Sequence, residues 1–379
     1  GETGGPAARG GLHVTFHWTG RAIVYNLIAE AHRGQNKKLA DGLGIIGTGA
    51  RAKEEVQGPG GKQLMSFLKA LLATAAAAGS LLATAFSAQA ERITVTHWGV
   101  LMYGAPYAVA IEKGFYKEVG LDIDGVLTSK GGGTTMRNVM AAELPYGEVA
   151  LAAVIAAMNQ GIELKIVHTG VRTAGEILWV TTPDSGINSI QDLAGKKVAF
   201  TSPKSVTDML LTMTLDKHKV KAETVSAGGI GSGLTMLDQK GVVAAPVMDP
   251  IWSKVQSKYK QVFAVADELP PMVQTVGVTT VEFAKNNPDK IRALTAARKK
   301  GVEFVYANPE EAAKIVAKHY EMDEALALQA IKNLSALKYW SDGTFEYEGM
   351  DNMVKGLQII GEVSGPVKWS EVVDESFLK

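Results

Sequence analysis

The feature that most restricts this chain is an apolar segment at residues 65–90 that has the three parts of a secretory signal peptide. Lys69 supplies the positive start, an apolar stretch follows, and the small residues Ala88 and Ala90 fit the two positions that a signal peptidase reads before its cut. A membrane anchor is the alternative, but the stretch is mostly alanine and is weakly hydrophobic for the roughly 20 residues that span a bilayer. We therefore expect cleavage after Ala90 and a folded protein that begins at Glu91.

Residues 1–64 precede this segment, although export signals stand at the N-terminus and Met65 is a better start than Gly1. We expect them to be upstream sequence translated by mistake. They contain the motif GLGIIG at Gly42–Gly47, which has the glycine spacing of a dinucleotide-binding loop. Such a loop must follow a strand and open a helix. The run at Gly58–Gly61 breaks any helix, so we expect no dinucleotide and no other cofactor.

Composition limits what the 289 residues after Ala90 can do. The chain holds 39 basic and 39 acidic residues, and removing the nine basic and five acidic residues of 1–90 leaves a net charge of about −4. This charge gives no basic surface for nucleic acid. Cysteine is absent from the whole chain, which excludes disulfides, thiolate metal sites, a cysteine nucleophile and a lipoprotein anchor. The length suits two lobes.

Strands and helices alternate after residue 90. Residues 93–97 alternate apolar and polar side chains, and Pro106 then opens a helical pattern. The same order recurs with a strand at 121–127 and a helix at 134–142. This alternation predicts an α/β fold with mainly parallel sheets flanked by helices.

The turn residues that follow Thr181 mark a lobe boundary, and a second series of strands and helices begins after them. We predict lobe one from residues 91–181 and 280–379 and lobe two from residues 182–279, with the apolar strand 272–279 as the return crossing. The last hundred residues read as helices that cover lobe one. Within them, Asn308 and Pro309 have the residue types of a helix start.

Several segments resemble one family. The run AIEKGFYKEVGLD at 110–122 is similar to the first helix and second strand of bacterial ABC-transporter solute-binding proteins of the nitrate, sulfonate and taurine type. Four further blocks agree in order, namely the loop 131–135, IQDLAGKKVAF at 190–200, NPEEA at 308–312 and VDESF at 373–377. Together they cover essentially all of 91–379.

The resemblance implies the type II periplasmic-binding-protein fold, with two lobes, two hinge crossings and a ligand cleft that closes on binding. It implies a monomer in the periplasm that delivers a small solute to an ABC permease and its ATPase. The solute is expected to be a small organic anion or zwitterion, such as a sulfonate or carboxylate. The alternative is a thiamine-precursor or pyrimidine-related binding protein or enzyme of the same fold.

Ligands of parallel sheets bind at the carboxyl ends of strands, where loops lead into helices. In lobe one this rule selects the loop after the first strand, the glycine loop before the second helix and the small residues after the next strand. Trp98 or Tyr103 either stacks on a planar ligand or fills the core. The glycine loop either admits a ligand to free amides or is a plain turn. The candidates are Trp98, Gly99, Tyr103, Gly132, Gly133, Thr134, Thr135, Ala152 and Ala153.

Four further candidates carry charge or hydroxyl groups. Arg172 is either the cation for a carboxylate or sulfonate, since its fork matches paired oxygens, or an ordinary surface arginine. Ser202 and Ser205 precede a predicted helix and either bind ligand oxygen or cap that helix. Asp249 resembles an acid that the family turns toward the cleft, but it could equally organise the turn at Pro250.

An enzyme is the competing class. Relatives of this fold that make thiamine precursors carry a cysteine-rich motif, which this chain lacks. No nucleophile elbow or zinc-binding helix motif is present, and the four histidines after residue 90 are widely separated. We therefore predict no catalytic residue and no metal site.

Overall fold

The computed structural model describes residues 91–129 and 131–379. The predicted extension at 1–64, the signal peptide at 65–90, the cut after Ala90 and the motif at Gly42–Gly47 lie outside the described residues. The chain divides into a unit at 1–87 and a unit at 88–379, and the second unit is described here by itself.

The first lobe is built on a five-stranded sheet with the order β2-β1-β3-β10-β4. Strand β1 (Glu91–Thr96) pairs in parallel with β2 (Ile123–Ser129) and β3 (Tyr146–Ala150). Strand β10 (Thr275–Thr280) is antiparallel to β3 and to β4 (Leu164–Val171). The antiparallel direction of β10 follows from the path of the chain, since β4 leads out of this lobe and β10 brings the chain back.

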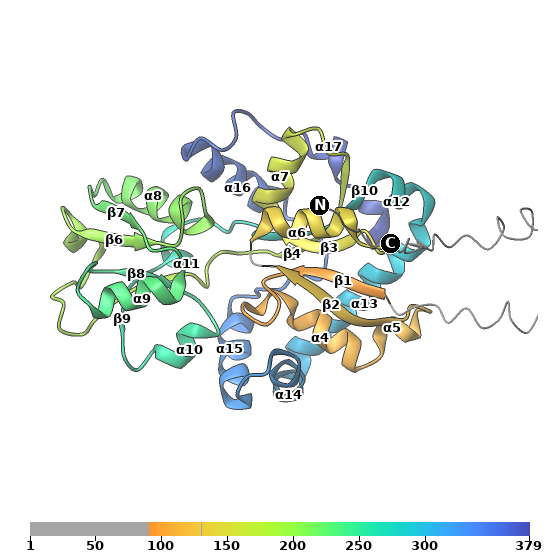
Figure 1. Ribbon diagram of the computed structural model, residues 1–379, viewed down its shortest axis with the longest axis horizontal. Helices are drawn as coiled ribbons and strands as arrows, with labels where there is room; N and C mark the ends of the chain where they lie inside the picture. The colour runs from red at the N-terminus through yellow and green to blue at the C-terminus, as the bar shows by residue number, and fades with distance from the viewer. Residues whose placement is uncertain (1–90, 130) are drawn as a thin grey trace, which may run out of the picture. The chain divides into compact units, whose positions relative to one another are not determined.

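Helices cover both faces of this sheet (Figure 1). Helices α6 (Gly132–Ala141) and α7 (Leu151–Asn159) pack together on one side. On the other side α4 (Ala105–Glu112) packs against α13 (Pro288–Ala307), with α5 (Phe115–Glu118) and α12 (Val281–Asn286) nearby.

Helix α13 buries one apolar face. Ile291, Leu294, Val302 and Val305 share this face by their spacing along the helix, and all four are buried. Gly301 lets α4 approach closely, because a Cβ atom at this position would lie 2.2 Å from the carbonyl oxygen of Pro106. The interface between these two helices therefore depends on close backbone contact as well as on apolar side chains.

The second lobe contains two small sheets (Figure 1). One has the order β8-β5-β9 and is antiparallel, with β5 (Leu178–Thr181), β8 (Ala245–Val247) and β9 (Lys260–Ala264). The other pairs β6 (Lys197–Phe200) and β7 (Glu223–Ser226) in parallel, and a parallel bridge from Val198 to Ala244 connects it to the first. Around them lie η3 (Ile190–Leu193), α8 (Val206–His218), α9 (Ile230–Asp238), α10 (Ile251–Val255) and α11 (Val265–Glu268).

The two-lobed α/β fold is confirmed, with two differences from the prediction. The sheets are mixed rather than mainly parallel, because every strand next to a crossing runs against its neighbours. Both crossings also come earlier. Strand β5 at 178–181 already belongs to the second lobe, and β10 from Thr275 already belongs to the first, so the chain crosses at 172–177 and 269–274.

The C-terminal helices reach both lobes, whereas the sequence predicted that they cover the first. Helix α14 (Pro309–Tyr320) starts at the expected Pro309 and packs on α4 and α15 (Glu324–Ala336). Helix α15 also contacts α10 of the second lobe, and α16 (Tyr347–Ile359) lies between α7 of the first lobe and α8 of the second. The chain ends with α17 (Trp369–Val372) and η4 (Glu375–Leu378).

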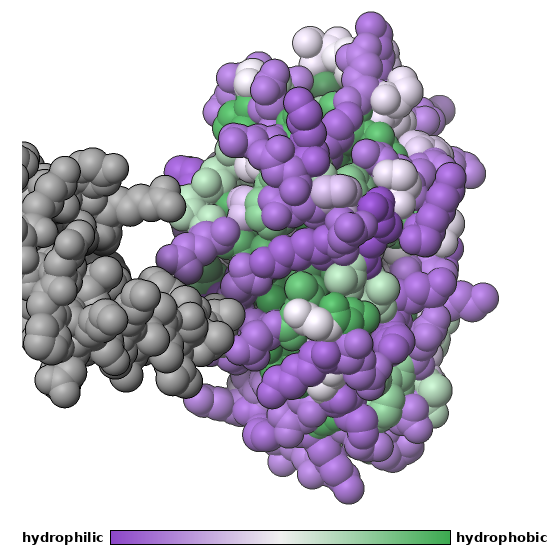
Figure 2. Space-filling view, turned by 90° about the vertical axis from the view of Figure 1, so that its right-hand side faces the viewer, coloured by the Kyte–Doolittle hydropathy of each residue, from purple (hydrophilic) through white to green (hydrophobic). Residues whose placement is uncertain are grey.

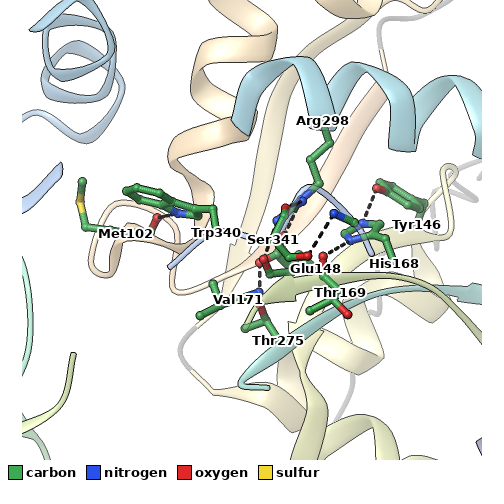
Figure 3. A network of polar contacts seen from close by, with 12 residues as sticks. Met102, Tyr146, Glu148, His168, Thr169, Val171, Thr275, Arg298, Trp340 and Ser341 are labelled. Atoms are coloured by element: carbon green, nitrogen blue, oxygen red, sulfur yellow. Dashed lines mark hydrogen bonds and ion pairs between the residues drawn. The ribbon is translucent and has the colours of Figure 1, made fainter. Parts of the chain in front are cut away.

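A buried ion pair fixes the centre of the first lobe (Figure 3). Arg298 of α13 and Glu148 of β3 are 1% and 0% exposed, and Arg298 Nε lies 3.0 Å from Glu148 Oε2. The guanidinium also donates to the carbonyl oxygens of Gly170 and Ser341, while Thr275 Oγ1 donates to Glu148 Oε1 at 2.6 Å. These bonds tie a helix, three strands and the segment after α15 into one support beneath the lobe interface.

The surface carries few large apolar side chains. The face of the first lobe in Figure 2 is covered mostly by hydrophilic residues, with smaller hydrophobic areas between them. Two of the exposed large apolar residues of the described chain, Val100 and Met140, line the cavity between the lobes. No helix in residues 91–129 and 131–379 is long and apolar enough to cross a membrane.

Candidate functional site

A cavity of about 1320 Å³ lies between the two lobes. Strand directions explain its position. In the first lobe β1 and β3 end toward the second lobe, and in the second lobe β8 runs against the outgoing β5 and so ends toward the first. Strand β6 is bridged in parallel to the chain just before β8 and ends on the same side. The loops that follow these four strands therefore meet at one place.

The walls of the cavity are largely apolar. Helix α7 contributes a row of alanines, α6 contributes Met136 and Met140, and the segment from α16 contributes Leu357 and Val363. The alanines leave room that larger side chains would fill. A ligand with an apolar body fits such walls, since burial of apolar surface favours binding.

Three helices begin at this cavity. Gly131 precedes α6 and Gly132 and Gly133 are its first residues, while Ser202–Ser205 lead into α8 and Gly228 and Gly229 lead into α9. Neither α6 nor α9 has a side chain that caps its first amides, and the glycines leave those amides accessible. Free amides and the positive end of the helix dipole favour an anionic group.

Three charged side chains line the same space. Arg137 lies one turn into α6, and its guanidinium donates to Thr134 Oγ1 at 2.8 Å. Lys204 of the second lobe and Glu362 beyond α16 form an ion pair with 2.6 Å between Nζ and Oε1. Lys204 has a φ of 65°, a left-handed conformation that is uncommon for lysine. The ion pair therefore joins the two sides of the cavity at a strained loop.

A polar cluster closes the end of the cavity near the crossings. Tyr103 and Gln274 line the cavity, and Tyr103 Oη donates to Gln274 Oε1 at 3.0 Å. Behind them, Gln274 Nε2 donates to Glu176 Oε1 at 2.6 Å, and the hydroxyl of Tyr339 lies 3.3 Å from the same oxygen. Burial raises the pKa of Glu176 to about 8. Glu176 belongs to the outgoing crossing and Gln274 to the returning one.

Seven of the predicted contact residues line the cavity, and they come from both lobes. Ser205 lines the cavity and also caps α8, because its Oγ accepts from Asp208 N at 3.3 Å. Gly132 also serves packing, since a Cβ atom there would lie 2.6 Å from Ala153 Cβ. The seven residues are Tyr103, Gly132, Gly133, Ala152, Ala153, Ser202 and Ser205.

Trp98 and Gly99 do not line the cavity. The indole of Trp98 packs edge-on against Tyr320, with 5.0 Å between ring centroids, so it fills space beside the core. Gly104 permits this packing, because a Cβ atom there would lie 2.4 Å from the indole. Gly99 has a φ of 75° and serves the turn after β1.

Thr134 and Thr135 also lie outside the lining. Thr135 is fully buried, and its Oγ1 bonds to Ser129 Oγ at 2.5 Å and to Thr96 Oγ1 at 3.2 Å. Thr134 accepts the bond from Arg137 described above. Both threonines therefore organise the start of α6, and the glycines before them face the cavity.

The two predicted charged contacts are used elsewhere. Arg172 forms an ion pair with Glu346 and does not line the cavity. Asp249 is 6% exposed, and its carboxylate accepts from Ser253 N and Ser253 Oγ at 3.0 and 2.6 Å. It also accepts from Asn333 Nδ2 of α15 at 3.0 Å. Asp249 thus bonds to Ser253 of α10 and connects the second lobe to α15. Burial raises the pKa of its carboxyl.

Several residues that line the cavity were not predicted from the sequence. Gly228 and Gly229 follow a strand and precede a helix, so the rule that selected the loop at 131–135 would have found them. Lys204 precedes Ser205 in the loop before α8, so the same rule would have predicted it as well. Gln274 and Leu357 have no local signal, because the returning crossing and a C-terminal helix bring them to the cavity.

Within residues 91–129 and 131–379, no group of three or more histidines, aspartates or glutamates is arranged to hold a metal ion. His97 lines the cavity, and burial lowers the pKa of its imidazole. The described site thus offers helix amides, hydroxyl groups and two cations inside largely apolar walls, which suits binding of a small molecule.

The sequence of this chain is similar to a family model and to proteins from bacteria. The family model described as NMT1/THI5 like matches residues 102–312. A Brucella abortus protein that is provisionally named a binding protein is 23% identical over 255 residues, covering 64% of this chain and 74% of its own length. A Legionella pneumophila 4-amino-5-hydroxymethyl-2-methylpyrimidine phosphate synthase is 23% identical over 243 residues, covering 61% and 75%.

Solved structures give the same fold. The periplasmic aliphatic sulphonate binding protein SsuA from Escherichia coli superposes with a TM-score of 0.61 at 16% identity, covering 75% of this chain and 92% of its own. At this identity the likeness concerns the fold and leaves the ligand open.

Proposed function

Since the chain belongs to the NMT1/THI5-like family, we propose that it is the solute-binding component of an ABC importer, and that its cavity takes a small organic anion or zwitterion. Its partners in this proposal are a membrane permease with its ATPase, and its compartment is the periplasm, after removal of residues 65–90. The protein acts by binding and release, with no catalytic step and no cofactor.

One observation carries this proposal. The starts of α6, α8 and α9 converge on a single cavity whose remaining walls are largely apolar. The uncapped amides at the starts of α6 and α9 stabilise an anionic group, and the walls accept a short apolar body. Arg137 and Lys204 add positive charge at the same place. A sulfonate or carboxylate on a small organic body combines both properties.

Delivery to a permease requires a difference between the empty and the loaded form. The lobes are joined at 172–177 and 269–274, and a solute that contacts loops of both lobes binds better when they approach each other. The permease would then recognise the closed form. The hydrogen bond between Asp249 and Asn333 joins the second lobe to α15, so a movement of the lobes acts on this contact.

The likeness to the Legionella synthase makes an enzyme of the same fold the second candidate. A pyrimidine would occupy the same apolar cavity. The absence of cysteine from the chain removes any thiol chemistry from such a candidate. Binding of a pyrimidine together with its turnover would favour this enzyme over the solute-binding protein.

A thermal-shift screen tests the proposal. The probes are sulfonates, nitrate, aliphatic and aromatic carboxylates, amino acids and pyrimidines. A ligand at 100 times its dissociation constant stabilises the folded state by about 2.7 kcal/mol. For a protein of this size we expect a rise in Tm of about 5 °C or more with one anionic class. If no class of probe raises Tm, the proposed function is contradicted.

Arg137 and Arg172 form a matched pair for the anion argument. We expect Arg137→Ala to weaken binding of the anion found in that screen by about 2-fold to 5-fold, because an exposed charge contributes up to about 1 kcal/mol. Arg172→Ala should leave the affinity unchanged, since Arg172 pairs with Glu346 outside the cavity. Calorimetric titration of both variants decides this. A loss of affinity in the Arg172→Ala variant alone would support the expectation from sequence that Arg172 binds the anionic group.

A further inference from the structure

Helix α16 lies between the two lobes, against α7 of the first and α8 of the second (Figure 1). Its two ends have different partners. The start of the helix is bonded to the first lobe and to the returning crossing, whereas its end contacts the second lobe. Helix α16 therefore spans the hinge beside the two crossings of the chain.

The start of α16 is held to the first lobe by side-chain hydrogen bonds. Tyr347 Oη donates to Glu375 Oε1 of η4 at 2.6 Å. The indole nitrogen of Trp369 in α17 donates to Asp351 Oδ1 at 2.7 Å. Both η4 and α17 pack on β4 of the first lobe. These two bonds fix the position of the first turns of α16 on that lobe.

The same turns are bonded to the returning crossing at 269–274. The backbone amide of Val273 donates to the carbonyl oxygen of Gly349 at 3.0 Å. Asn352 is 8% exposed, and its Nδ2 donates to the carbonyl oxygen of Pro271 at 3.1 Å. Hydrogen bonds have strict requirements for distance and angle. A movement of the start of α16 away from the crossing would therefore break both bonds.

The end of α16 contacts the second lobe through packing that has no fixed direction. A Cβ atom at Gly356 would lie 2.4 Å from Met209 Sδ and 3.0 Å from Met213 Sδ, so two methionines of α8 pack directly on the helix backbone. Methionine side chains are flexible and adapt to a shifted partner. The ion pair of Lys204 with Glu362 follows, and the Lys204 side chain is 67% exposed. Such exposed pairs hold their partners weakly.

The size of the cavity indicates which contact of α16 changes on binding. The cavity has a volume of about 1320 Å³, whereas ligand pockets usually have about 300 to 1,000 Å³. A small solute that touches both lobes therefore requires them to approach each other. Because α16 contacts both lobes, one set of its contacts must shift in that movement. The packing on methionines shifts at lower cost than the hydrogen bonds at the start of the helix.

We infer that α16 moves with the first lobe when the solute binds, and that its end slides over Met209 and Met213 of α8. The inference rests on the proposed function, and it makes α16 a sliding contact that works beside the two crossings. The affinity for the solute then depends on whether α16 is free to slide.

A disulfide across this contact tests the inference. A Cβ atom at 356 would lie 2.9 Å from Met209 Cγ, the atom that a cysteine sulfur would replace, and a disulfide needs about this separation. The chain has no cysteine, so Met209→Cys with Gly356→Cys forms one defined cross-link. We expect the oxidised double variant to bind the probe about 10-fold or more weakly than the same variant after reduction. The reductant should leave the affinity of the unchanged protein as it is.

Spin labels measure the movement directly. Gln358→Cys on α16 is labelled together with Asp216→Cys on α8, or with Lys299→Cys on α13 of the first lobe. All three positions are exposed and lie outside the lining of the cavity. With saturating probe, pulsed electron paramagnetic resonance should show a change of about 2 Å or more in the distance from 358 to 216. The distance from 358 to 299 should stay the same.

The probe in both experiments is the sulfonate or carboxylate that gives the largest rise in Tm in the thermal-shift screen. Equal affinities of the oxidised and reduced variant would overturn the inference and leave the proposed function intact. A change in the distance from 358 to 299 with a constant distance from 358 to 216, or no change in either, would do the same. If no probe binds the unchanged protein, the proposed function falls and the inference falls with it. If the disulfide variant does not fold or does not oxidise, the two distances decide.

Discussion

Replacing Arg298 with alanine is expected to lower the free energy of unfolding by about 3 to 5 kcal/mol, the usual cost of breaking a buried ion pair. The substitution leaves the Glu148 carboxylate at 0% exposure with Thr275 as its side-chain donor. It also leaves the carbonyl oxygens of Gly170 and Ser341 without the guanidinium that now donates to both. Burial of unpaired charge, added to the lost bonds, gives the large effect.

Arg292 on the same helix provides the control. Its ion pair with Asp289 is solvent-exposed, with Asp289 95% exposed, so Arg292→Ala should cost well under about 1 kcal/mol. Urea unfolding followed by circular dichroism measures both variants. Equal costs for the two substitutions would show that the network around Glu148 does not support the first lobe as described.

Replacing Ala156 with tryptophan is expected to weaken solute binding by about 100-fold or more, which corresponds to about 2.7 kcal/mol. Ala156 lines the cavity from α7 and is exposed to it, so an indole there occupies the space that the solute needs. Because the position is open, the new side chain meets no packed neighbour and stability should change little. Titration with the anion found by the screen measures the loss.

Ala325 offers the matched control for this substitution. It is exposed in the first turn of α15 and does not line the cavity. Ala325→Trp adds the same side chain to a helix surface and should leave the affinity unchanged. Full affinity in the Ala156→Trp variant would mean that the solute binds outside the cavity between the lobes.

Much of the fold could be predicted from local patterns. The alternation of strands and helices after residue 90 predicted the α/β fold, and Asn308 and Pro309 marked the start of α14. The lobe crossings were misplaced by several residues, because an apolar strand such as β5 reads the same on either side of a boundary. Sheet membership is set by pairing between distant segments, which periodicity does not record.

The site was predictable where it depends on strand ends and small residues. Gly132 and Gly133 begin α6 after a strand, Ser202 and Ser205 lie between a strand and α8, and all four line the cavity. Charged residues were predicted less well, because a sequence does not show which partner each one meets. Arg172 meets Glu346 and Asp249 meets Asn333, so neither remains for a ligand in this arrangement.

The cluster of Tyr103, Gln274, Glu176 and Tyr339 could not be predicted for a related reason. Its members come from the loop after β1, from both crossings and from the segment after α15, and their sequence separations reach 171 residues for the bond between Tyr103 and Gln274. Only the folded chain brings them together.

The central claim is that one small anionic solute binds in the cavity between the lobes. Isothermal titration calorimetry of the purified protein with the anion classes of the screen tests it directly. We expect saturable binding of one molecule per chain for at least one anionic class, with a negative heat-capacity change from apolar burial. The absence of binding to every class, or binding that survives unchanged in the Ala156→Trp variant, would contradict it.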